Sequence, residues 1–176
     1  MIFTESKLKG AFIIEMEKRS DDRGFFARTW CKHEFEIQGL CTNFVQVNLA
    51  FNEKKGILRG MHYQRNPYEE VKLVRCTRGA LYDVIVDIRK SSSTYKKWIG
   101  VELTQDNYKM LYVPEGFAHG YQTLQDHTEI IYQVSQFYTP NSEGGVRWND
   151  PTVNIVWPET EERNISPKDQ MWPLLA

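Results

Sequence analysis

The chain has 176 residues, of which 41% are apolar and 13% aromatic, and this fits one globular domain spanning residues 1–176. Its 22 lysines and arginines nearly balance its 23 aspartates and glutamates, so it lacks the basic excess of a dedicated nucleic-acid surface. The three cysteines are odd in number and show no C-x-x-C spacing, which argues against a disulfide framework and a cysteine-based zinc site. Reduced thiols indicate a cytoplasmic protein.

The N-terminal segment carries Glu5, Lys7 and Lys9 before its first apolar run, which covers only residues 11–14. Such a run is too short for a signal peptide or a membrane span. We therefore expect a soluble protein without a membrane partner.

Short apolar or alternating runs, separated by turn residues, then recur along the chain. Many short strands at this spacing are typical of a β-sandwich or barrel. The runs cover residues 10–16, 24–30, 44–51, 57–64, 72–89, 98–103, 109–119 and 128–138.

Helix signals are scarce. Residues 32–39 predict a helix, since they end in a glycine suited to a helix C-cap. A single helical turn is predicted near 103–107 and another near 166–171. The proline-rich segment after residue 138 predicts an ordered but irregular wrap over the barrel.

Alternation assigns faces to two of these runs. In residues 44–51 the odd positions are all apolar, whereas the even positions include Gln46 and Asn48. In residues 81–89 Asp83 shares a face with Leu81 and Ile85. These polar groups either point into a lumen or face solvent, and the pattern alone leaves both open.

Residues 56–75 read as strand but carry Arg59, His62 and Lys72. In a dry core each charge would cost several kcal/mol unless paired, so this face is expected to line a wet cavity. Strict alternation separates Arg59 from His62. A bulge at Gly60 would turn both into one cavity.

Two segments resemble the motifs of the cupin superfamily, a jelly-roll β-barrel. They are Gly56 to His62 and the "PEGFAH" run that ends at His119. Metal-binding cupins typically supply three histidines and a glutamate, but Gln64 stands at one histidine position, with Glu69 near the glutamate position. An amide is a poor substitute for imidazole toward transition metals, so we expect neither a metal nor another cofactor.

A closer resemblance spans residues 21–169. The ordered segments "DDRGFFARTW", "FVQVN", "GILRGMHYQ", "KLVRCTRGALYDVIVDIR", "VPEGFAHGYQTL", "IIYQVSQFY", "GGVRWNDP" and "ISPKD" resemble the dTDP-4-dehydrorhamnose 3,5-epimerase family. Its members are metal-free cupins, usually homodimers, that act on nucleotide sugars in the pathway to dTDP-L-rhamnose and related deoxysugars. The resemblance implies an all-β jelly-roll β-barrel with a few short peripheral helices.

It also implies a chemistry. A 4-keto sugar has acidic C–H bonds at C3 and C5, and inverting either carbon needs proton removal from one face and return on the other. The family's motifs imply that His62 is the base, oriented by Asp169, and that Tyr132 protonates the opposite face. Lys72 would then stabilise the C4 oxyanion.

The remaining motif positions imply substrate contacts. His119 and Asp83 resemble a second imidazole–carboxylate pair that supports binding in the same pocket, and arginine forks suit a diphosphate. The implied substrate-binding set is Arg23, Arg28, Gln46, Asn48, Arg59, Asp83, His119, Glu143 and Lys168. His33 and His127 fall outside the motifs and are expected at the surface, and Trp148 and Trp172 are expected in packing or an interface.

The sequence departs from the family pattern at two places. Arg28 stands where many members have glutamate, and Glu70–Val71 precede Lys72 where "QG" is common. The implied catalytic set is intact, so the nucleobase and the sugar stay open, as does inversion at only C3 or only C5.

Several other functions stay open on the same barrel. One is a metal-dependent oxygenase or isomerase that uses His62, Glu69 and His119. The others are a catalytically silent sugar-binding cupin and, less favoured, a sugar ketoisomerase.

Overall fold

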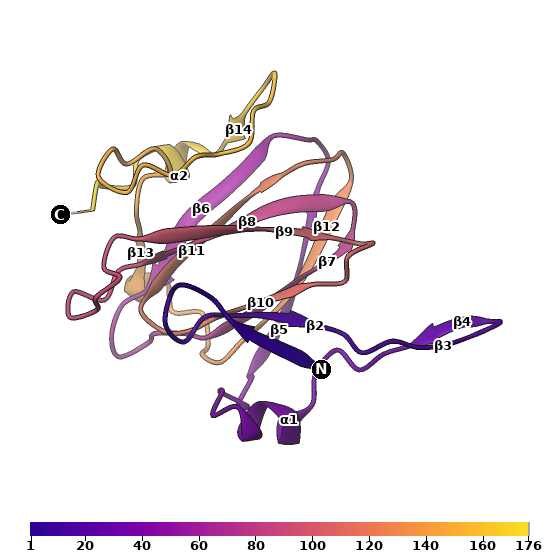
Figure 1. Ribbon diagram of the computed structural model, residues 1–176. Coiled ribbons are helices and arrows are strands. Elements are labelled where there is room, and N and C mark those ends of the chain that lie inside the picture. Colours follow the sequence, from indigo (N-terminus) through magenta and orange to yellow (C-terminus); the bar gives the residue numbers. More distant parts are fainter. Residues whose placement is uncertain (176) are drawn as a thin grey trace.

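The computed structural model describes residues 1–175, and within them two β-sheets face each other (Figure 1). The strands are β1 (Ile2–Glu5), β2 (Phe12–Glu15), β3 (Arg19–Asp21), β4 (Gly24–Phe26), β5 (Gln46–Asn52), β6 (Ile57–Gln64), β7 (Lys72–Arg78), β8 (Ala80–Asp87), β9 (Trp98–Thr104), β10 (Met110–Val113), β11 (Phe117–Thr123), β12 (Thr128–Val134), β13 (Glu143–Gly145) and β14 (Asn164–Ile165). The helices are α1 (Lys32–Ile37), α2 (Pro167–Gln170) and a single 3₁₀ turn, η1 (Pro140–Ser142).

The strand order is that of a jelly roll. One sheet has the order β1-β2-β10-β7-β12-β5 and the other the order β13-β6-β11-β8-β9, with β14 added in parallel to β6. Apart from the pairs β1–β2 and β8–β9, neighbouring strands of both sheets are not consecutive in the chain, as in other double-sheet jelly rolls. The all-β jelly-roll fold expected from the sequence is confirmed.

The main core fills the space between the sheets. Alternate residues of strands from both sheets point into it, and their burial supplies most of the driving force for folding. Its fully buried members include Val74, Cys76, Leu81, Ile85, Leu103, Leu111 and Ile130.

Each sheet is also covered on its outer face. On the first sheet, Phe35 of α1 is fully buried against Ile14, Leu73 and Met110. On the second, the segment after β13 packs Val153, Ile155 and Trp157 over Val84 and Val86, and Figure 1 shows this C-terminal layer in yellow. The predicted irregular wrap is therefore confirmed.

Two of the predicted helical segments are present. Helix α1 covers Lys32–Ile37, and Gly39 follows it with φ +67°, a left-handed conformation suited to ending a helix. Helix α2 forms within 166–171. Residues 105–107 form a turn rather than a helix, because Thr104 Oγ1 accepts the Asn107 N–H at 2.9 Å and closes the chain locally.

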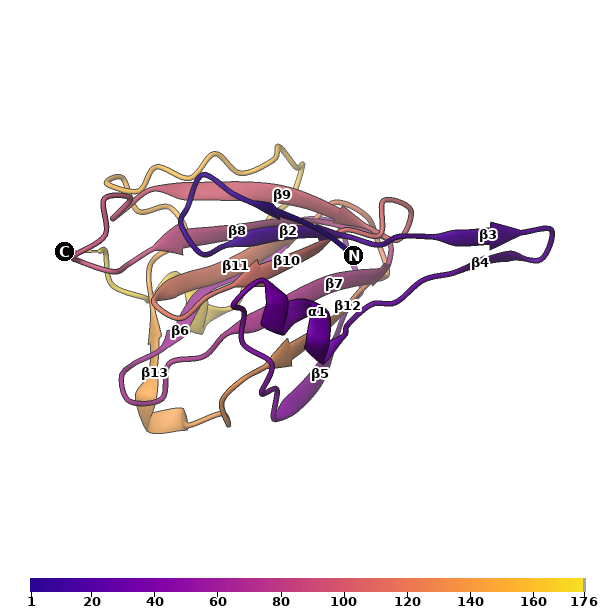
Figure 2. The same cartoon turned by 60° about the horizontal axis from the view of Figure 1, so that its bottom comes forward.

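The strand predicted over 24–30 is much shorter. Only Gly24–Phe26 is extended, and it pairs with β3 to form a hairpin arm that projects away from both sheets (Figures 1 and 2). Phe26 on this arm is 67% exposed. Phe25 on the same arm packs edge-on against Tyr108 of the body, with the ring centres 5.1 Å apart.

The bulge predicted at Gly60 is present. His62 pairs with His119 and Arg59 with Tyr121, so two residues of β6, Gly60 and Met61, oppose the single Gly120. Gly60 has φ +133°, and a Cβ there would lie 2.6 Å from the Cα of Gly120. Only glycine fits this close approach, and the extra residue reorients the strand between Arg59 and His62.

Strand β5 is an edge strand with two different faces. Gln46 and Asn48 point inward, whereas Val47, Leu49 and Phe51 are 66%, 60% and 40% exposed. The apolar face of this strand therefore faces out of the molecule. Among residues 1–175 no helix is long and apolar enough to cross a membrane.

Candidate active site

A cavity of about 470 Å³ opens between the two sheets at one end of the jelly roll. It continues into a smaller one of about 220 Å³, since His62, Lys72 and Tyr132 line both. Its walls are mostly polar, as the ionisable groups of the 56–75 stretch predicted. The larger cavity is lined by Gln46, Asn48, His62, Tyr63, Gln64, Glu70, Lys72, Tyr132, Val134, Tyr138 and Glu143.

His62 and Asp169 form a hydrogen-bonded pair in this wall. The Nε2 of His62 lies 2.6 Å from Oδ1 of Asp169, and the two side chains are 32% and 6% exposed. Burial works to raise the pKa of Asp169, but hydrogen bonding and charge from His62 outweigh it, so this pKa lies below its ordinary value. An ionised carboxylate only accepts, so Nε2 carries the hydrogen and Nδ1 is left as the basic nitrogen.

The C-terminal segment brings Asp169 to this place. Strand β14 pairs with β6 at Ile57 and Leu58, and α2 begins directly after it. Ser166 caps α2 by accepting the N–H of Asp169 at 3.1 Å. The backbone N–H of Gly60 donates to the Asp169 carboxylate at 3.3 Å, so the bulge also helps to hold the carboxylate.

Tyr132 reaches the same cavity from the opposite sheet. It lies on β12 between Asn48 of β5 and Val74 of β7. Burial raises the pKa of its phenol, and the nearby charge of Glu70 adds to this. The phenol is therefore protonated at neutral pH and able to donate a proton.

Lys72 lies beside Tyr132 and pairs with a residue that sequence reasoning did not assign to the site. Its Nζ is 3.1 Å from Oε1 of Glu70, and both side chains are only 12% exposed. The departure at Glu70–Val71 was visible in the sequence, but the pairing of Glu70 with Lys72 was not.

A second imidazole–carboxylate pair lies deeper. His119 Nε2 is 2.7 Å from Oδ1 of Asp83, which is completely buried, and His119 lines the smaller cavity together with Arg59. The other oxygen of Asp83 has no hydrogen-bond partner within residues 1–175. Asp83 therefore points inward, and the solvent-facing alternative for it is wrong.

The rim of the larger cavity carries Glu143 on β13. Its Oε2 accepts from Lys168 Nζ at 2.6 Å and from the Tyr138 hydroxyl at 3.0 Å. Burial works to raise the pKa of Glu143, yet these donors hold it below its ordinary value. Lys168 lines an adjoining groove of about 370 Å³ with Arg59 and Asp169.

With this geometry in view, comparison with known proteins identifies the family. The sequence profile of the dTDP-4-dehydrorhamnose 3,5-epimerase family matches residues 5–176. The chain belongs to the dTDP-4-dehydrorhamnose 3,5-epimerase family.

Relatives agree along the whole length. The dTDP-4-dehydrorhamnose 3,5-epimerase of Salmonella typhimurium is 42% identical over 176 residues, covering 99% of this chain and 96% of the relative. The crystal structure of the Bacillus anthracis enzyme, with TDP and PPi bound, has a TM-score of 0.94 at 42% identity and covers 99% of both chains. That of the Legionella pneumophila epimerase, in complex with dTDP-4-keto-L-rhamnose, has a TM-score of 0.92 at 36% identity and covers 99% of this chain and 92% of that one.

Two residues of the substrate-binding set implied by the epimerase motifs lie away from the cavity of their own chain. Arg23 is 85% exposed at the end of the hairpin arm, where it pairs with Asp21 at 2.6 Å. Arg28 pairs with Glu34 at 3.1 Å and lines a separate groove beside Met1. Their predicted contacts with substrate stay predictions.

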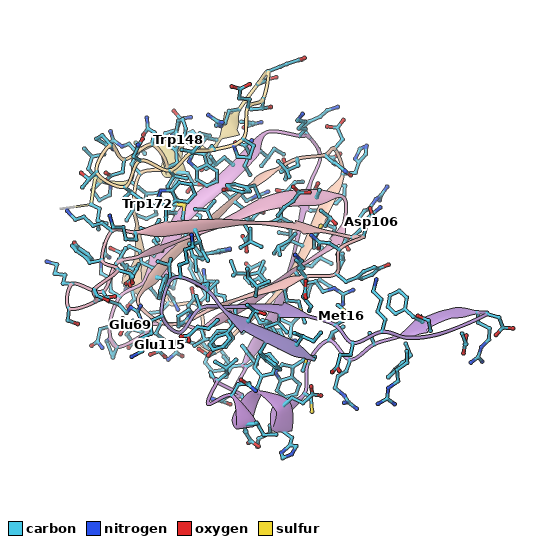
Figure 3. All side chains as sticks on the ribbon, in the orientation of Figure 1. Met16, Glu69, Asp106, Glu115, Trp148 and Trp172 are labelled. Carbon is cyan, nitrogen blue, oxygen red and sulfur yellow. The ribbon has the colours of Figure 1, made fainter. Side chains whose placement is uncertain are left out.

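Gln64, which stands at a histidine position of metal-binding cupins, forms hydrogen bonds to the backbone of two loops in this epimerase fold. Its Nε2 donates to the carbonyls of Tyr68 and Phe137, and its Oε1 accepts the N–H of Thr139 at 2.6 Å. The amide thereby ties two loops to β6. Glu69 lies in another groove with Glu115, and Figure 3 shows both at one edge of the molecule. Within residues 1–175 no three His, Cys, Asp or Glu side chains are placed to hold one metal ion.

Trp172 has a closer relation to the site than packing. Its Nε1 donates to Oδ1 of Asp169 at 3.2 Å, and its ring meets that of His62 edge-on at 6.1 Å. Gly145 makes room for it, because a Cβ there would overlap the indole. Figure 3 shows Trp172 and Trp148 in the C-terminal layer. From the sequence, Trp172 was expected in packing or an interface, and Tyr138 was not assigned a role. His33 and His127 are exposed, as expected.

Proposed function

We propose that this protein is a nucleoside-diphosphate 4-keto-6-deoxy-sugar 3,5-epimerase that acts in deoxysugar and surface-polysaccharide biosynthesis. The observation that supports this most is that the His62–Asp169 pair and Tyr132 enter one cavity from facing sheets. A hexose held between them would present opposite faces of its ring to an imidazole and a phenol. Membership in the epimerase family supports the same activity.

The steps follow from the acidity of carbons beside a ketone. Nδ1 of His62 takes the proton from C3 or C5, the electron pair moves onto the C4 oxygen, and the resulting enolate recovers a proton at carbon from Tyr132 on the other face. A positioned acid or base of this kind contributes about 10²–10⁴-fold to the rate. Lys72 lines the same cavity, and we assign to its ammonium the stabilisation of the C4 oxyanion, which is worth several kcal/mol in a water-poor site.

The nucleotide part of the substrate needs cations and amides. Gln46 and Asn48 on β5 line the cavity, and Arg59 and Lys168 line the adjoining groove. We assign the diphosphate to the groove lined by Arg59 and Lys168, since guanidinium and ammonium groups are the usual partners of phosphate oxygens. The two relatives solved with TDP or a dTDP-sugar favour dTDP as the carrier.

Isotope exchange tests the proposal. Incubation with dTDP-4-keto-6-deoxyglucose in deuterated water should place deuterium at both C3 and C5, read by NMR, because each carbon loses its proton and regains one from solvent. Label at only one of the two carbons would indicate a single-site epimerase. Absence of exchange with every nucleotide variant would contradict the proposal, and loss of exchange after dialysis against EDTA would favour a metal-dependent cupin.

We further propose that residues 1–176 form one domain, that two copies form a homodimer, and that the enzyme is cytoplasmic, which fits its free cysteines. Two features support the dimer. The outward face of edge strand β5 exposes Val47, Leu49 and Phe51, an apolar strip that a second copy would cover. The β3–β4 hairpin projects away from both sheets in both views (Figures 1 and 2), and Arg23 lies in the turn between these two strands, so Arg23 would serve the cavity of the partner.

Mixing two inactive variants tests this arrangement. Arg23→Ala and His62→Ala, mixed after reversible dissociation, should regain about a quarter of wild-type activity, because half of the random dimers carry one site with both residues intact. Light scattering should give twice the 20.7 kDa of the chain. No recovery in the mixture, with both variants dimeric and Arg23→Ala inactive alone, would place Arg23 in the cavity of its own chain.

A further inference from the structure

Arg59 is held by only one of its nitrogens. Its Nε donates to Oδ1 of Asn52 at 3.0 Å, while the two terminal nitrogens have no hydrogen-bond partner within residues 1–175. The residue is exposed where the smaller cavity meets the groove that also contains Lys168. Its two free nitrogens are therefore available to an anion.

The group that holds Arg59 is itself fixed. Asn52 is the last residue of β5 and is only 1% exposed. Its Nδ2 donates to the carbonyl of Thr128 at 3.2 Å, and its Oδ1 accepts a second hydrogen bond, from the Tyr121 hydroxyl at 3.3 Å. A flipped amide would set its NH₂ against two donors and its oxygen against a carbonyl, so one orientation is stable.

Tyr121 acts as a permanent donor in this arrangement. Burial raises its pKa to about 12, so the hydroxyl keeps its hydrogen at every pH at which the protein would be assayed. Two buried polar side chains, Asn52 and Tyr121, thus form the hydrogen-bonded group that orients one exposed arginine, Arg59. Buried polar groups of this kind fix geometry when all their partners are present.

We propose that Asn52, supported by Tyr121, is a positioning residue that holds Arg59 by Nε and so directs its two terminal nitrogens to a bound diphosphate. The inference rests on the proposed function, in which Arg59 meets the diphosphate of the substrate. An arginine fixed in advance loses less freedom when the anion binds, so Asn52 acts on affinity rather than on proton transfer.

Substitution by leucine removes both hydrogen-bonding ends of Asn52 at similar size. We expect Asn52→Leu to weaken binding of dTDP and of inorganic pyrophosphate about tenfold by calorimetry, which is about 1.4 kcal/mol. The KM for the sugar nucleotide should rise in parallel while kcat stays within about twofold, since an interaction equal in ground and transition states changes KM alone.

A double-mutant cycle separates positioning from general loss of structure. In an Arg59→Met background, Asn52→Leu should cost no further affinity, because the arginine through which it acts is gone. Gln122→Leu is the matched control. Gln122 is fully buried, and its Oε1 accepts a hydrogen bond from Arg163 Nε at 2.9 Å. This contact lies outside the cavity, so Gln122→Leu should lower stability without changing dTDP affinity.

Several outcomes would overturn the inference. They are unchanged dTDP affinity in Asn52→Leu, an equal loss with and without Arg59, or an equal loss in Gln122→Leu. If Asn52→Leu does not fold, the isosteric variant Asn52→Asp tests the contact between residue 52 and Arg59 instead. Its carboxylate would engage a second nitrogen of Arg59 and weaken pyrophosphate binding, and unchanged binding would contradict the contact. A wild-type protein that binds dTDP without exchanging hydrogen would contradict the proposed function but leave this inference standing.

Discussion

Replacing His62 by alanine should reduce deuterium exchange at C3 and C5 by about 10²–10⁴-fold, the usual contribution of a positioned general base. The substitution removes the proposed base, whose imidazole pairs with Asp169, whereas the cations and amides proposed to bind the nucleotide are untouched. Calorimetry with dTDP should therefore show near-normal affinity. The measurement is exchange followed by NMR under saturating substrate, so that kcat is compared and not KM.

The matched control is His127→Ala, which removes an exposed imidazole whose closest charged partner is Glu53 at 3.6 Å. It should exchange at the wild-type rate. Unimpaired exchange in His62→Ala would show that another group abstracts the proton, and the proposed mechanism would fail at its first step.

Replacing Tyr132 by phenylalanine should separate proton removal from inversion. The ring and its packing remain, but the phenol that is proposed to return a proton to the opposite face is lost. His62 can still remove a proton and return deuterium to the same face. Deuterium should therefore enter the substrate while formation of the inverted sugar slows by about 10²–10⁴-fold. NMR reads both quantities, because inversion changes the proton couplings of the ring.

The pH profile adds a second measure of Tyr132. Because burial raises its pKa, inversion in the wild type should persist through mildly alkaline pH and fall only as the pH rises through that raised value. Tyr132→Phe should lack this alkaline limb. Tyr108→Phe, which removes a hydroxyl outside the cavity, should behave as wild type, and normal inversion in Tyr132→Phe would assign the acid to another group.

Much of the fold was predictable because strands have a short period that a sequence displays directly. The eight runs contain most strands of the two sheets, and a glycine at 60 indicated the bulge that the register confirms. The shortest strands, such as β13 and β14, were not visible, since two or three residues carry no period. Alternation in β5 separated its faces correctly but could not say that the apolar one points outward.

The site was predictable to the extent that motifs mark it. His62, Lys72, Tyr132 and Asn48 line one cavity, as the motifs implied. Glu70, Tyr138 and Trp172 were not assigned, because their contacts depend on how loops fold over β6 and no local pattern encodes that. Asn52 was missed for another reason: its contacts join it to Arg59 on β6 and Tyr121 on β11, and the sequence does not show which residues of different strands meet.

The route by which Asp169 reaches His62 has a consequence for biosynthesis. The two residues are 107 positions apart and the chain between them supplies β7 to β14, so on the ribosome β6 and the strands that follow it can pair before the carboxylate emerges. A nascent chain at that stage would have the strands that line the pocket, but His62 would lack the carboxylate that orients it. The proton transfer proposed for this pair would thus begin only after residue 169 has left the ribosome and Asp169 has reached His62.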